Sequence, residues 1–170
     1  MQSISDFMNR FTQAMQLKDF YSMEKLYQEM KKQFGDFVFE EERKGNIRFR
    51  KKLYQTTFFT EIQQNRVELP KEGIAYLNIT QTSNAALHFF ENSYMIVSPT
   101  ALLSRLYQDG AFESTAVCLD VENHILQLKE WSMAKAHLQN GDILKIDVEN
   151  TGLFLQKFHL EPPLIYSLSK

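Results

Sequence analysis

The chain has 170 residues, of which 44% are apolar and 24% are charged, and its formal net charge is −2. This length is typical of one domain, and the composition excludes a disordered tail, a collagen-like fibre and a highly charged nucleic-acid-binding polymer. The one cysteine, Cys118, excludes an internal disulfide framework and a zinc site built from several cysteines. Because no apolar run is long enough to span a membrane and the N-terminus lacks a signal-peptide pattern, we expect a cytoplasmic protein without a membrane span.

The first 35 residues have the spacing of two amphipathic helices. Apolar side chains recur every three or four residues over 4–15 and again over 23–34. Residues 17–19 interrupt the pattern between them. We therefore expect a helical pair whose apolar faces pack on the rest of the protein.

Alternation of apolar and polar residues replaces the helical spacing after residue 36 and predicts strands. Single strands are expected at 56–62 and 74–80. Four hairpins are expected, pairing segments within 37–53, 86–90 with 94–97, 117–121 with 126–128, and 144–148 with 153–158. The two-residue turn at Glu122 and Asn123 would pair Leu119 with Leu126, whereas the register of the last hairpin stays open.

Ser98 and Pro99 have the pattern of a helix start, with Ser98 as N-cap, and Gly110 is a typical helix end. We expect a third helix over 99–110. Residues 131–138 fit a strand and a helix equally well, so their structure stays open.

These elements predict an α+β protein, with the N-terminal helical pair packed on a mainly antiparallel sheet or partly closed barrel and one further inserted helix. No internal repeat, low-complexity tract or linker is visible, so we expect a single domain over 1–170. Its parts are the helical pair (1–35), a first strand group (36–98), the helix (99–110), C-terminal hairpins (111–160) and a tail (161–170).

Asp120, Glu122 and His124, with Cys118 beside them, are the best catalytic candidates in the sequence. A carboxylate next to an imidazole can orient a general base, and three such groups can hold a metal. The expected hairpin register opposes both roles, because it directs Asp120 and His124 to opposite faces of the sheet. We therefore expect turn residues, with no catalytic, cofactor or metal site, and a Cys118 that packs as a small core side chain.

A basic segment with interleaved aromatic residues suggests nucleic-acid binding as one alternative. Its basic residues are Arg43, Lys44, Arg48, Arg50, Lys51 and Lys52. In the expected hairpin, Glu40 and Glu42 lie opposite two of these arginines and neutralise much of their charge. A salt ladder is therefore the preferred interpretation, and a nucleic-acid partner is not expected.

No phosphate-binding loop, nucleophile elbow or paired-cysteine motif occurs in the sequence. His88 lies among apolar residues and is expected to be a hydrogen-bonded core histidine. The 14 phenylalanines favour a bulky core or an aromatic surface. We therefore expect a non-catalytic protein-binding or adaptor module whose partner is another protein, and a homo-oligomer stays open. The alternative is a small-ligand pocket, with or without enzymatic activity, between sheet and helices.

Overall fold

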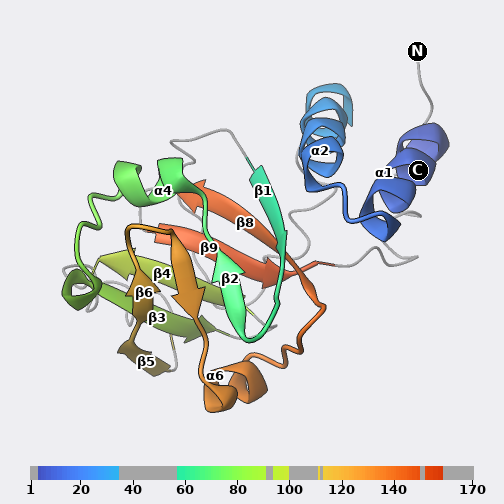
Figure 1. Ribbon diagram of the computed structural model, residues 1–170. Coiled ribbons are helices and arrows are strands. Elements are labelled where there is room, and N and C mark those ends of the chain that lie inside the picture. The colour runs from blue at the N-terminus through green and yellow to red at the C-terminus, as the bar shows by residue number, and fades with distance from the viewer. Residues whose placement is uncertain are drawn as a thin grey trace.

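A computed structural model of the chain describes residues 4–34, 57–90, 94–99, 111, 113–149 and 152–158. Within them the architecture is α+β, with N-terminal helices packed on a mainly antiparallel sheet, as the sequence predicts (Figure 1). The expected hairpin over 37–53, the expected helix beyond residue 99 and the C-terminal tail lie outside the described residues. No described helix is long and apolar enough to cross a membrane.

Helices α1 (Ile4–Gln16) and α2 (Phe20–Phe34) form the predicted pair. Their apolar faces meet an aromatic cluster at the β1 edge of the sheet, because Phe11 lies against Phe59 and Phe158 with ring centroids 5.8 Å and 5.5 Å apart. Phe11 is fully buried, and burial of such a side chain contributes about 1.5–3 kcal/mol. The pair is therefore joined to the sheet through the core.

The strands form two sheets with antiparallel neighbours. The six-stranded sheet has the order β1 (Thr57–Glu61), β8 (Ile143–Glu149), β9 (Gly152–Lys157), β4 (Tyr94–Pro99), β3 (Ala85–Phe90) and β5 (Glu113–Ala116). The three-stranded sheet has the order β2 (Arg66–Glu68), β7 (Ile125–Gln127) and β6 (Cys118–Asp120). One apolar cluster contains buried side chains from both sheets, which places the main core between them.

The strand predicted over 74–80 is wrong, because helix α4 (Lys71–Tyr76) occupies its first half. Pro70 is the N-cap, and Asn78 ends the helix with a φ of 57°. The Ile79 N–H donates to the Ile74 carbonyl at 3.2 Å, and both side chains are buried. This is a Schellman cap, in which the apolar residues on either side of the helix end meet in the core.

Residues 131–138, which fitted a strand and a helix equally well, contribute to helix α6 (Glu130–Lys135) and its end. Its end repeats the cap of α4, because His137 has a φ of 57° and the Leu138 N–H donates to the Met133 carbonyl at 2.8 Å. Figure 1 shows the two short helices at opposite ends of the β region.

Three predicted hairpins are confirmed. Leu119 pairs with Leu126 as expected, but the predicted two-residue turn is wrong, because the ladder ends at Asp120 and Ile125 and leaves a four-residue turn. Pairing of Glu149 with Gly152 sets the open register of the last hairpin. The helix start expected at Ser98 and Pro99 is not observed there, since both residues belong to strand β4 and Ser98 pairs with Ala86.

The two halves of the β region have equivalent strand orders and registers, although no repeat is visible in the sequence. In the six-stranded sheet, β1, β8 and β9 follow one another from one edge, and β5, β3 and β4 follow one another from the other edge. Strand β1 therefore corresponds to β5, β8 to β3 and β9 to β4. The registers agree, because the ladder that begins at Ala85 and Pro99 corresponds to the ladder that begins at Leu144 and Lys157. Strands β2 and β7 also correspond to each other, and they pair directly in one antiparallel ladder.

Backbone geometry at the start of these two strands supports the equivalence. Asn65, before β2, and His124, before β7, have φ values of 59° and 60°. The Leu69 N–H donates to the His124 carbonyl, and the Leu128 N–H donates to the Asn65 carbonyl, both at 2.7 Å. The molecule therefore contains two copies of one strand–turn–strand–helix–hairpin unit, related by an approximate two-fold axis.

Candidate functional site

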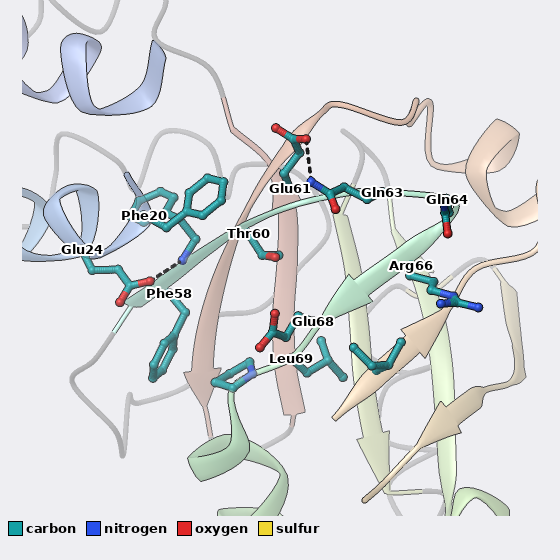
Figure 2. A pocket seen from close by; sticks show the side chains of 13 residues that line it. Phe20, Glu24, Phe58, Thr60, Glu61, Gln63, Gln64, Arg66, Glu68 and Leu69 are labelled. Atoms are coloured by element: carbon teal, nitrogen blue, oxygen red, sulfur yellow. Dashed lines mark hydrogen bonds between the residues drawn. The ribbon is translucent and has the colours of Figure 1, made fainter. Parts of the chain in front are cut away.

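A cavity of about 530 Å³ lies between α2, β1, β2 and the start of α4 (Figure 2). This volume falls within the range of about 300–1,000 Å³ that is typical of ligand sites. Its charged and aromatic lining consists of Phe20, Glu24, Phe58, Phe59, Glu61, Arg66 and Glu68. Three carboxylates and one guanidinium make this lining acidic.

The cavity exists because β1 and β2 separate soon after the turn that joins them. Gln63 and Arg66 exchange two backbone hydrogen bonds, of 3.2 Å and 2.9 Å. Two residues further along the same register, Glu61 would face Glu68, but the described strands form no ladder there. We call this gap between β1 and β2 the seam; Phe59, Glu61 and Glu68 flank it.

Backbone groups of β1 point into the seam. The Ile62 N–H donates to the Asp142 carbonyl at 2.9 Å, so even-numbered residues of this strand bond to β8. Because hydrogen bonding alternates along an antiparallel strand, Phe59 and Glu61 direct their N–H and C=O groups to the other side. Among the described strands β1 is an edge of the six-stranded sheet, so no described strand pairs with these groups.

Strand β2 presents its own backbone groups from across the seam. Leu69 bonds to His124, which directly precedes β7, so alternation directs the N–H and C=O groups of Glu68 away from β7 and toward β1. The N–H and C=O groups of Arg66 have the same orientation, and both are hydrogen-bonded to the backbone of Gln63. The seam therefore lies between two strand edges.

Glu24 on α2 covers one end of the β1 edge. Its Oε2 accepts the Phe59 N–H at 3.1 Å, as Figure 2 shows. Burial raises the pKa of the Glu24 carboxyl, and the nearby Glu72 carboxylate raises it further, whereas the hydrogen bond from Phe59 acts in the opposite direction. A side-chain acceptor thus replaces the carbonyl that a neighbouring strand would supply.

Glu61 is fixed at the centre of the seam by an ion pair. The Lys18 Nζ lies 2.7 Å from Glu61 Oε2, and Gln63 Nε2 donates to Glu61 Oε1 at 3.2 Å. The bond from Lys18 is the main reason that the pKa of the Glu61 carboxyl is lowered. Glu61 therefore stays charged over the whole neutral range.

The equivalent place in the second half is closed. Gln63 and Arg66 correspond to Asp120 and Ile125, and there the ladder continues, so that Cys118 pairs with Gln127 where the first half has Glu61 and Glu68. The cavity beside this pair measures about 10 Å³. Opposed carboxylates repel one another across a strand pair, whereas a thiol and an amide do not. The open and the closed place therefore differ in charge at both opposed positions.

Asp120, Glu122 and His124 lie in the four-residue turn between β6 and β7 and at its edge. The Asp120 carboxylate accepts hydrogen bonds from the N–H and the side-chain amide of Asn123, at 3.1 Å and 2.8 Å. These bonds are the main reason that the pKa of Asp120 is lowered. No hydrogen bond links Asp120 to the His124 ring within the described segments, so the carboxylate serves the turn.

Cys118 is exposed, and the expectation of a core side chain is wrong. Alternation along β6 turns Leu119 into the core and leaves the residues on either side of it outside.

His88 is a hydrogen-bonded core histidine, as the sequence predicts. It is fully buried, its Nδ1 lies 2.5 Å from Ser114 Oγ, and its Nε2 lies 2.7 Å from Ser98 Oγ. Burial lowers the pKa of His88 from 6.5 to about 4, so the ring is neutral at pH 7.

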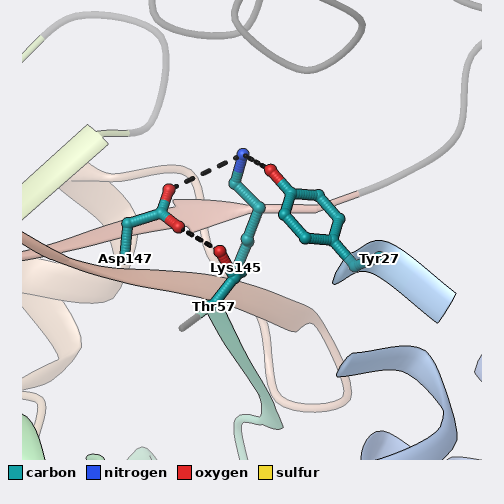
Figure 3. Close-up of polar contacts among 4 residues, drawn as sticks. All are labelled: Tyr27, Thr57, Lys145 and Asp147. Atoms are coloured by element: carbon teal, nitrogen blue, oxygen red, sulfur yellow. Dashed lines mark hydrogen bonds and ion pairs between the residues drawn. The ribbon is translucent and has the colours of Figure 1, made fainter. Parts of the chain in front are cut away.

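The counterpart of His88 in the second half is Asp147, part of a buried polar cluster beneath α2 (Figure 3). Thr57 Oγ1 donates to Asp147 Oδ1 at 2.6 Å, as Ser114 meets His88 in the other half. Lys145 Nζ lies 3.8 Å from Asp147 Oδ2 and 3.4 Å from the Tyr27 hydroxyl. This cluster links α2 to the sheet and is closed to solvent.

No group of three or more potential metal-ligating side chains occurs among the residues that the structure describes. The basic residues 43–52 lie outside those segments. Comparison with known families, curated proteins and solved structures found no match for this chain. The sequence interpretation missed the seam, because the opposition of Glu61 and Glu68 becomes visible only when the Gln63–Arg66 register is known.

Proposed function

We propose that the chain is a non-catalytic protein-binding module that binds its partner through the seam. The observation that carries this proposal is the edge of β1, which no described strand covers and whose backbone groups at Glu61 face an acidic cavity of about 530 Å³. An open strand edge is a template for pairing with another chain, and native proteins cover such edges unless they use them.

The cavity supports a second candidate, a pocket for a small cationic ligand, because it lies between a helix and the sheet and its lining is acidic. A protein partner fits better, since the backbone groups along the edge of β1 match the repeat of a polypeptide. Nucleic acid fits poorly, because Glu24, Glu61 and Glu68 would repel phosphates.

Affinity capture from a native lysate tests the proposal when seam variants are compared. The full chain and a Glu122→Lys control, which changes an exposed turn residue in the other half, should retain one protein in comparable amount. Glu68→Lys should reduce its recovery at least tenfold. Equal retention by Glu68→Lys, or no retained protein with any bait, contradicts the proposal. A small cation that is seen by native mass spectrometry and lost in Glu68→Lys would favour the second candidate.

A further inference from the structure

We infer that the segment bound by the seam is an extended, basic stretch of a partner protein, which adds to β1 as a further strand. This inference rests on the proposed function and specifies the chemistry of its partner. Three observations carry it: the direction of the backbone groups, the charge of the lining, and the alternation of polar and apolar side chains around the seam.

The backbone of β1 offers a register for one added strand. Glu61 presents an N–H and a C=O to the seam, and Phe59 presents its C=O while its N–H is held by Glu24. The Gln63–Arg66 bridge closes the other end. The register therefore extends over about three to four residues, or about 10–13 Å at the rise of a strand.

The side chains around the seam select an alternating sequence. Glu61 and Glu68 lie on one face of their strands, whereas Phe58 and Leu69 lie on the opposite, core-facing side. Successive residues of an added strand point alternately to these two faces. Lysine or arginine is therefore expected at every second position, with apolar residues between.

Charge complementarity favours a basic segment over an acidic one. The Glu61 carboxylate is already paired with Lys18, but Glu68 is exposed and makes no ion pair among the described residues. Arg66, the cation of the lining, donates from Nε to Gln127 Oε1 at 3.1 Å and is drawn toward β7. Glu68 is thus the carboxylate that an incoming cation meets.

Three synthetic libraries of ten-residue peptides provide the test. In the first library, lysine and arginine are fixed at alternate positions and the others are random; the second has aspartate and glutamate there. The third copies the first but carries N-methyl groups on alternate amides, which blocks pairing with a strand. At about 150 mM salt, the immobilised full chain should retain the basic library at least tenfold better than either of the others.

Charge reversal supplies the matched variants. Glu68→Lys should lose the basic library and gain affinity for the acidic one, whereas Glu122→Lys should behave as the parent. A basic library retained no better than the acidic one overturns the inference. So does equal retention of the N-methylated library, because charge alone would then explain binding.

These outcomes separate the inference from the proposed function. If lysate capture depends on Glu68 but the basic library gains nothing, the partner binds the seam in another conformation, and strand addition is wrong while the protein-binding role stands. If the basic library binds the parent but lysate capture does not depend on Glu68, the proposed function fails.

Discussion

Glu61 and Glu68 stand at opposed register positions across the seam, where the second half of the molecule pairs Cys118 with Gln127. The two halves share their strand order, their helix caps and their ladder registers, and they differ here. Two glutamates occupy these opposed positions at the seam, whereas a thiol and an amide occupy them in the closed β6–β7 ladder.

Replacing Glu68 by Gln gives the seam the uncharged partner that the second half has at the same place. We expect the free energy of unfolding to rise by about 0.2–1 kcal/mol, because a like-charge opposition is removed. Chemical denaturation of the variant and the parent measures this difference. The exposed Glu122→Gln should leave stability unchanged, and a Glu68→Gln variant less stable than the parent would show that the carboxylates do not repel.

The buried ring of His88 makes stability depend on pH. Its pKa is about 4 in the folded chain against 6.5 in the unfolded chain, so the unfolded chain takes up the proton first. The stabilisation is complete above pH 6.5 and is lost as the pH falls from 6.5 to about 4, by roughly 3 kcal/mol in total.

Denaturation curves at several pH values check this dependence. His88→Gln should reduce the slope between pH 6.5 and 4, while His137→Asn, which changes an exposed ring and keeps a residue suited to its positive φ, should retain it. An unchanged slope in His88→Gln would assign the effect to other groups.

Lys145 and Asp147 should be strongly coupled, because both are almost fully buried beneath α2. Lys145→Met leaves the Asp147 carboxylate without its cation and should cost about 3–5 kcal/mol. The double variant Lys145→Met and Asp147→Leu should cost less than the single one. A double-mutant cycle measures the coupling, and additive losses would argue against the pair.

Phe11 tests whether the helical pair belongs to the folded core. Phe11→Ala empties a site between Phe59 and Phe158 and should cost about 3–5 kcal/mol in unfolding free energy. Tyr21→Ala on the outer face of α2, where the side chain is 66% exposed, should cost at most about 0.5 kcal/mol. Similar small losses for both variants would indicate that the pair is an independent arm.

Much of the fold could be predicted because its local patterns are strong. The helical spacing in residues 4–34 and the two-residue alternation around Leu119 and Leu126 identified both the elements and one ladder register. The segment 74–80 was wrongly predicted as a strand, since buried Ile74 and Ile79 belong to a helix and its cap.

The duplication and the seam could not be read from local patterns. Over 65–90 and 124–149, the identical pairs are Leu69 with Leu128 and Ala75 with Ala134, so the repeat is conserved in shape and burial and hidden in sequence. That Glu61 and Glu68 face each other is known only from the strand registers, which the sequence does not give at this place. The sequence candidates Asp120, Glu122 and His124 were chosen by residue type at a single turn, so they could not point to the seam.

Amide hydrogen exchange in the free protein, followed by NMR, tests the open seam most directly. We predict that the N–H groups of Glu61 and Glu68 exchange within about tenfold of the rate of an unstructured chain, because no strand in the described part of the chain pairs with them. The N–H groups of Cys118 and Gln127, which face each other within the β6–β7 ladder, should exchange at least 100-fold more slowly, a factor that corresponds to about 2.7 kcal/mol. Equal protection of all four amides would show that the seam is closed in solution and would contradict the account.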